Sequence, residues 1–204
     1  MSQIILFDID NTLIDTFKLA SQIDEQIISN YSIPRDNFIS AKNEYYSQIK
    51  VPTRFNPQNY CAHIATSFNL DLEKIETIFN QSKYYINSLF PGTKLVLSQL
   101  SIDNKLGIFS EGYEDFQIKK LKLSGIYSYF IPSLFFIFSD KLKEANLTKL
   151  PTGSLIIDDK LSVVKKISNF KNLDILLIDR KNNITNQKNM VKIDSLTYIK
   201  NYIK

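Results

Sequence analysis

Short apolar segments of strand length alternate with amphipathic helical patterns along much of this chain. The strand-like segments are residues 4–9, 105–110, 154–159 and 173–179, with helical patterns at 113–125 and 160–170 between the later ones. Strand, helix and strand in repetition are typical of a parallel sheet that is covered by helices on both faces. The sequence therefore predicts an α/β fold.

Residues 15–88 interrupt this alternation, because they contain only helical patterns such as FKLASQIDEQIISNY and DLEKIETIFNQSKYYINSLF. The turn-forming stretch PGT at 91–93 then provides a helix start and returns the chain to the alternating layout. We therefore expect a core of residues 1–14 and 89–204 and an inserted helical unit at 15–88.

Charge and composition exclude several classes of protein. The 25 Lys and Arg residues exceed the 21 Asp and Glu residues by only four and form no basic block, which argues against nucleic-acid binding. The longest apolar run, residues 129–138, is too short for a membrane span and contains a proline. A single cysteine, Cys61, cannot form an internal disulfide. We expect a soluble, cytoplasmic protein that is a monomer or a weak homodimer.

Carboxylates and a hydroxyl follow the predicted strands at the point where each strand ends. These residues are Asp8, Asp10, Ser110, Asp158 and Asp159. Because parallel strands bring their carboxyl ends to one edge of the sheet, these side chains should meet there. Two carboxylates 4 Å apart repel by about 4 kcal/mol at an effective dielectric constant of ~20. A cation must offset this repulsion, and hard oxygen ligands of this kind suit Mg²⁺.

Each of these residues also has a structural interpretation when it is taken alone. Asp8 and Asp10 could be a helix N-cap and a solvated turn acid, Asp158 and Asp159 could cap a helix, and Ser110 could be a structural residue. Only their ordered combination favours a reactive site. The single histidine, His63, lies in a helical pattern and reads as a packed or surface residue.

Three segments resemble the motifs of one enzyme superfamily. DIDNTLIDT (8–16) resembles the first motif of the haloacid dehalogenase superfamily phosphatases, LGIFSEG (106–112) the second and LIIDD (155–159) the fourth. The resemblance implies a Rossmann-like parallel-sheet core with an inserted all-helical cap domain. Residues 109–130 further resemble phosphoglycolate-phosphatase-like members of the superfamily.

The resemblance implies a role for each motif residue. Asp8 would attack phosphorus and form an aspartyl-phosphate, and Asp10 would act as acid and then as base. Ser110 would hydrogen-bond a phosphoryl oxygen. Asp158 and Asp159 would hold Mg²⁺ together with Asp8 and the backbone carbonyl of Asp10.

Four further residues are expected near the substrate. Thr12 is expected to orient the loop and, with Glu111 and Gly112, to lie at the substrate. Arg54, in a proline-bounded loop of the insertion, could bind an anionic tail of the substrate, and a surface arginine is the alternative interpretation. Asn11 replaces a glycine that is common in the family, and asparagine tolerates turn conformations.

The third motif is a lysine that neutralises the phosphoryl group, and two lysines compete for this role. We expect Lys141, with Asp140 capping a helix that begins at 140–142, because Lys143 would point about 200° around that helix. Neither lysine is followed by the proline that is frequent in the family. Lys160 is the next candidate.

Together, these expectations predict an enzyme that hydrolyses a small phosphorylated metabolite and depends on Mg²⁺. The alternatives on the same fold are a phosphomutase and a haloacid dehalogenase, and the non-enzyme alternative is a regulator that binds phosphate. Asp10 argues against dehalogenation, because a halide leaving group needs no proton. The sequence does not identify the substrate.

Overall fold

The computed structural model describes residues 2–49, 55–184 and 190–203. They form a six-stranded, all-parallel sheet with the strand order β3-β2-β1-β4-β5-β6. The strands are β1 (Ile4–Phe7), β2 (Lys105–Glu111), β3 (Phe135–Phe138), β4 (Leu155–Asp158), β5 (Asp174–Ile178) and β6 (Val191–Ile193). This is the doubly wound Rossmann-like order, so the predicted α/β class is confirmed. Strand β6 is short and was not expected from the sequence.

Both faces of the sheet are covered, as the apolar strands require. Alternate residues of β1 point to opposite faces, so that Ile5 and Phe7 join one core cluster and Leu6 joins the other. The elements around the sheet are α6 (Thr93–Asp103), α7 (Glu114–Leu123), α8 (Glu144–Leu147), α9 (Leu161–Ile167) and the 3₁₀ helices η2 (Tyr127–Tyr129), η3 (Pro132–Leu134) and η4 (Leu196–Tyr202). Residues of α6, α7 and η4 pack in the first cluster, and residues of α8 and α9 pack in the second.

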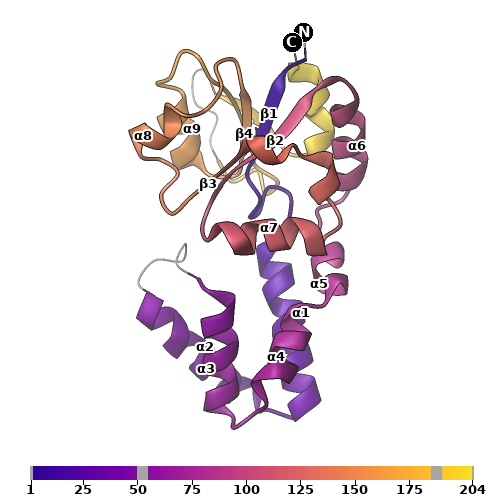
Figure 1. The fold of residues 1–204 in the computed structure, drawn as a ribbon, viewed down its shortest axis with the longest axis vertical. Coiled ribbons are helices and arrows are strands. Elements are labelled where there is room, and N and C mark those ends of the chain that lie inside the picture. Colours follow the sequence, from indigo (N-terminus) through magenta and orange to yellow (C-terminus); the bar gives the residue numbers. More distant parts are fainter. Residues whose placement is uncertain (1, 50–54, 185–189, 204) are drawn as a thin grey trace.

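The described elements between β1 and α6 are helices, joined by loops and turns. The helices are α1 (Thr16–Tyr31), α2 (Arg35–Ile49), α3 (Pro57–Ser67), α4 (Leu72–Phe79) and α5 (Ser82–Asn87), which we call the helical segment. The helical segment lies together on one side of the sheet, with α7 between the two (Figure 1). The division into residues 1–14 with 89–204 and residues 15–88 is in keeping with this arrangement and remains our proposal.

Two short stretches of chain connect the helical segment to the sheet, and they are paired with each other. Ile14 and Leu89 form an antiparallel bridge, the backbone N–H of Asp15 donates to Ser88 O at 2.8 Å, and that of Phe90 donates to Leu13 O at 3.1 Å. The Asp15 side chain also caps α1 by accepting from Lys18 N at 2.9 Å. The entry and exit of the helical segment are therefore held side by side.

No helix among the described residues is both long enough and apolar enough to cross a membrane.

Candidate active site

The carboxyl ends of β1, β2 and β4 bring three of the expected residues together. Asp8 directly follows β1, Ser110 lies near the end of β2 and Asp158 ends β4. All three are buried, and Ser110 Oγ donates a hydrogen bond to Asp8 Oδ1 at 3.0 Å. The backbone N–H of Asp8 donates to Ile157 O at 2.9 Å, which fixes the carboxylate at the sheet edge.

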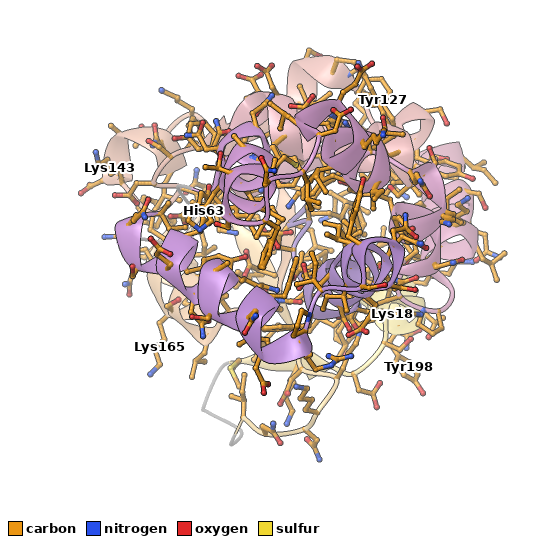
Figure 2. The ribbon with its side chains drawn as sticks, turned by 90° about the horizontal axis from the view of Figure 1, so that it is seen from below. Lys18, His63, Tyr127, Lys143, Lys165 and Tyr198 are labelled. Carbon is orange, nitrogen blue, oxygen red and sulfur yellow. The ribbon has the colours of Figure 1, made fainter. Side chains whose placement is uncertain are left out.

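Lys141 lies inside this group of residues. Its ammonium Nζ is 2.8 Å from Asp8 Oδ1 and 2.6 Å from Asp158 Oδ2, and its side chain is fully buried. Burial alone would lower the pKa of Lys141, but the two carboxylates raise it above its usual value, so the side chain stays charged. Lys143 is exposed and extends from the edge of the molecule (Figure 2), and Lys160 is exposed as well. The geometry thus brings Lys141, and not Lys143, to the carboxylates, and its role as the third-motif lysine stays a prediction.

The helix expected to position Lys141 was predicted wrongly. Helix α8 begins at Glu144, and residues 140–143 form a turn. Asp140 does accept a hydrogen bond from Leu142 N at 3.2 Å, but this bond stabilises the turn and not a helix start. The side chain of Lys141 therefore reaches the site from a turn.

Three carboxylates form a cluster that fits a hard divalent cation. Asp8, Asp158 and Asp159 each offer one oxygen, and these oxygens lie within 4.8 Å of one another. Two buried oxygens of the cluster, Asp8 Oδ2 and Asp159 Oδ1, have no hydrogen-bond partner among the described residues. The ammonium of Lys141 contributes one positive charge to this group. When all four side chains are ionised, the group therefore has a net charge of −2. Unpartnered oxygens with excess negative charge are the donor set that such a cation requires.

The pKa values of the cluster reflect the same crowding. Burial, and then the charge of Asp8, raise the pKa of Asp158 even though Lys141 opposes the shift. Burial and the charges of Asp8 and Asp158 raise the pKa of Asp159 to about 7. Because a bound cation favours the ionised carboxylates, it would reverse these shifts.

Asp10 is held by two side chains of α7 that the sequence did not reveal. Lys120 Nζ lies 2.5 Å from Asp10 Oδ1, and Gln117 Nε2 donates to Asp10 Oδ2 at 3.1 Å and to Glu111 O at 2.8 Å. Burial would raise the pKa of Asp10, but the charge and hydrogen bond of Lys120, with that of Gln117, lower it overall. The carboxylate of Asp10 is thus ionised at neutral pH and fixed in orientation, and it is not part of the three-carboxylate cluster.

The loop after β1 is fixed by its own turn and by an arginine from the far end of the chain. Asn11 has a φ of +58°, a left-handed conformation that asparagine adopts more readily than most residues. Arg180, which follows β5, donates to Asn11 O at 2.7 Å and to Thr12 O at 2.6 Å. Its guanidinium also lies 3.5 Å from the ring centroid of Phe90, next to the exit of the helical segment. Arg180 therefore contacts both the loop after β1 and the chain segment that leaves the helical segment.

The four residues expected near the substrate occupy different positions. The Thr12 hydroxyl is buried and has no partner within the described part of the chain. Glu111 and Gly112 line a cavity of about 490 Å³, which Asp10 and Lys120 also reach. Arg54 lies outside the described residues.

Lys120, Gln117 and Arg180 are the site residues that sequence reasoning missed. Gln117, Lys120 and Ser124 are polar residues at helical spacing, which in a sequence indicates a solvent-facing stripe. All three are buried in the structure. The one feature of the sequence that could have indicated Gln117 and Lys120 is their position shortly after the second motif. Arg180 follows a predicted strand, the usual place for a ligand-binding residue in this class of fold.

Comparison with known proteins agrees with this fold. A family model described as haloacid dehalogenase-like hydrolase matches residues 5–140, about two thirds of the chain. A search of curated protein sequences found no match. Fold and site define a doubly wound α/β protein with a carboxylate-rich site at the sheet edge. The chain belongs to the haloacid dehalogenase-like hydrolases, which confirms the resemblance seen in the sequence.

Solved structures share the fold over almost the whole chain. The haloacid dehalogenase-like hydrolase from Burkholderia xenovorans has 16% identity and a TM-score of 0.74, covering 97% of this chain and 94% of that one. The HAD-hydrolase YfnB from Bacillus subtilis, bound to magnesium, has 17% identity, a TM-score of 0.63 and 98% coverage of both chains. The HAD phosphatase from Thermococcus onnurineus has 21% identity and a TM-score of 0.62, covering 99% and 97%. At such identities the likeness establishes the fold alone.

Proposed function

We propose that this hydrolase is a Mg²⁺-dependent phosphatase that cleaves a small phosphomonoester through an aspartyl-phosphate on Asp8. The observation that carries the proposal is the pair of buried, unpartnered carboxylate oxygens, Asp8 Oδ2 and Asp159 Oδ1, in a cluster that also contains Asp158. A carboxylate oxygen without a hydrogen bond is available both as a metal ligand and as a nucleophile. The magnesium bound to the Bacillus relative supports the choice of metal.

The residues around the cluster divide the chemistry among them. Asp8, Asp158 and Asp159 would hold Mg²⁺, which when bound draws negative charge from the phosphoryl oxygens. Ser110 and Lys141 hold Asp8 Oδ1 at 3.0 and 2.8 Å, which fixes the orientation of the carboxylate that would attack phosphorus. Lys141 also offsets the charge that gathers as the P–O bond to the leaving group breaks.

Asp10 is the acid and base of the proposal. Ionised and oriented by Lys120, its carboxylate is ready to take a proton from the water that attacks the aspartyl-phosphate. Protonation of the leaving oxygen in the first step needs Asp10 in its acid form. The arriving phosphate favours that form, because a nearby negative charge raises the pKa of a carboxyl group.

The direct test measures which product is released. Purified protein with Mg²⁺ should release inorganic phosphate from a panel of sugar phosphates, nucleotides and phosphoglycolate, and excess EDTA should abolish the release. Asp8→Asn should be inactive, with an unchanged circular dichroism spectrum. Release of halide from 2-chloropropionate, formation of an isomeric sugar phosphate, or full turnover in EDTA would each contradict the proposal.

A further inference from the structure

The cavity of about 490 Å³ lies directly over Asp10. Its lining comes from α1, α2, α3 and α4 of the helical segment and, on the core side, from α7, the end of β2 and Lys160. Asp10, Gln117 and Lys120 lie at its core end. A leaving group whose oxygen takes a proton from Asp10 must therefore extend into this cavity, so the lining selects the leaving group.

Aromatic rings line this cavity from both sides. Tyr60 and Phe79 come from the helical segment and Phe116 comes from α7. The rings of Phe79 and Phe116 lie 6.0 Å apart between centroids, so they pack across the junction between the helical segment and the core. Phe79 and Tyr60 are buried, and their contacts are explained by packing alone.

Three other aromatic residues of the lining remain partly exposed, although Tyr46 also packs against Tyr45 and Phe55. Phe17 on α1 is 76% exposed, Tyr46 on α2 is 38% exposed and Tyr113 before α7 is 47% exposed. They come from three separate elements and meet at one cavity. Exposed aromatic rings around a concave site offer faces on which another flat ring can stack.

The charged groups of the lining are largely paired with each other. On the side of the helical segment, Lys42 forms an ion pair with Asp24, and the Tyr60 hydroxyl donates to the other oxygen of Asp24 at 2.9 Å. On the core side, Lys120 is paired with Asp10. Within the described lining, the helical segment thus offers no unpaired cation to a second anionic group on the substrate. On the core side, Lys160 has no ion pair among the described residues, but its charge acts on Asp10 and Asp159, so it lies toward the phosphate end of the cavity. An uncharged leaving group suits this lining better than one that ends in a carboxylate.

We propose that the cavity binds an uncharged leaving group that carries a flat aromatic or heteroaromatic ring. The substrate is then an arylalkyl or nucleoside monophosphate, which refines the proposed phosphatase function and rests on it. A volume of about 490 Å³ lies within the range of about 300–1,000 Å³ that is usual for sites of drug-sized ligands. A two-carbon leaving group would leave most of this space empty.

Pairs of esters that differ only by the ring test the inference. Adenosine 5′-monophosphate and uridine 5′-monophosphate share the 5′-phosphate ester with ribose 5-phosphate, and 2-phenylethyl phosphate is compared with butyl phosphate. All five release a primary alcohol, so the chemical step is similar. We expect kcat/KM to be on the order of ten- to a hundredfold higher for the ring-bearing esters, from stacking on one aromatic face or two. A preference in one pair alone also supports the inference and identifies which kind of ring is recognised.

Variants of the exposed rings locate the effect. Tyr46→Leu and Tyr113→Leu should each reduce the ring preference severalfold, because kcat/KM should fall more for the ring-bearing esters than for ribose 5-phosphate and butyl phosphate. The matched control is Tyr198→Leu, because Tyr198 is 51% exposed, lies on η4 at the edge of the molecule (Figure 2) and is not part of the cavity lining. This control should keep the full preference. Equal kcat/KM within both pairs, or a preference that survives both cavity variants, would overturn the inference.

Calorimetric binding of adenosine separates this inference from the phosphatase proposal. Turnover of all esters without any ring preference contradicts the ring pocket and leaves the phosphatase proposal intact. No phosphate release from any ester, together with adenosine binding that Tyr46→Leu weakens, contradicts the phosphatase and supports the pocket. Neither release nor adenosine binding contradicts both.

Discussion

Replacing Lys141 by methionine removes the only charged partner of Asp8 and Asp158 among the described residues while keeping an unbranched side chain. Both carboxylates are buried, and breaking such a pair from one side costs about 3–5 kcal/mol of unfolding free energy. For a chain of this length each kcal/mol lowers Tm by roughly 2–4 °C. In EDTA at pH 8 we therefore expect Tm to fall by roughly 6–20 °C.

The same substitution should damage catalysis beyond its effect on stability. With Mg²⁺ present and the temperature well below Tm, kcat/KM should fall by on the order of 10²-fold or more, which corresponds to about 3 kcal/mol of transition-state stabilisation. Steady-state phosphate release and thermal denaturation followed by circular dichroism measure the two effects separately.

Lys143→Met is the matched control, because Lys143 is two residues away and exposed. Surface substitutions of this kind usually change stability by no more than about 0.5 kcal/mol, and the activity should stay near normal. A Lys141→Met protein with unchanged Tm and unchanged kcat/KM would refute the placement of the lysine. A large activity loss in Lys143→Met would refute it equally.

Three further predictions follow from other parts of the structure. Lys120→Met should lower kcat by about tenfold or more and change KM less, and Lys120→Arg should recover part of the loss, because Lys120 orients Asp10. The rise in Tm on adding Mg²⁺ should be small at pH 5.5 and large at pH 8, because Asp159, with its pKa raised to about 7, must lose its proton before the metal binds. Without metal the sign is opposite: stability should fall as pH rises from about 4 to about 7, since only the folded state retains that proton. Gly107→Ala should lower the unfolding free energy by about 1–3 kcal/mol or more in urea titration, because a Cβ there would lie 2.5 Å from Leu134 O.

The residues at the strand ends could be predicted from the sequence for a simple physical reason. A run of apolar residues marks a buried strand, and the first polar residue after it must lie at the sheet edge. Asp8, Ser110 and Asp158 follow this rule, and the structure brings them together. The sequence predicts a parallel α/β class but not the order of the strands, because strand pairing depends on contacts between residues that are distant in the sequence.

The residues that support these side chains could not be predicted in the same way. Lys120 and Gln117 occupy a polar stripe of α7 that would face solvent on an isolated helix, and only the packing of α7 beside Asp10 buries them. Arg180 contacts the loop at Asn11 from 169 positions away in the chain. The position of Lys141 was anticipated from motif order, but the turn that carries it was mistaken for a helix start.

The aspartyl-phosphate on Asp8 is the central claim, and chemical trapping tests it most directly. Asp10→Asn should still form the intermediate from p-nitrophenyl phosphate, whose leaving group needs little protonation, and should hydrolyse it slowly because the base is missing. Borohydride reduces an acyl phosphate to an alcohol and does not reduce a free carboxylate. Mass spectrometry of the peptide that contains residues 4–16 should then show reduction at Asp8 when Mg²⁺ and substrate are present, and none in EDTA. A protein that releases nitrophenol with Mg²⁺ while Asp8 remains unmodified would contradict the covalent mechanism.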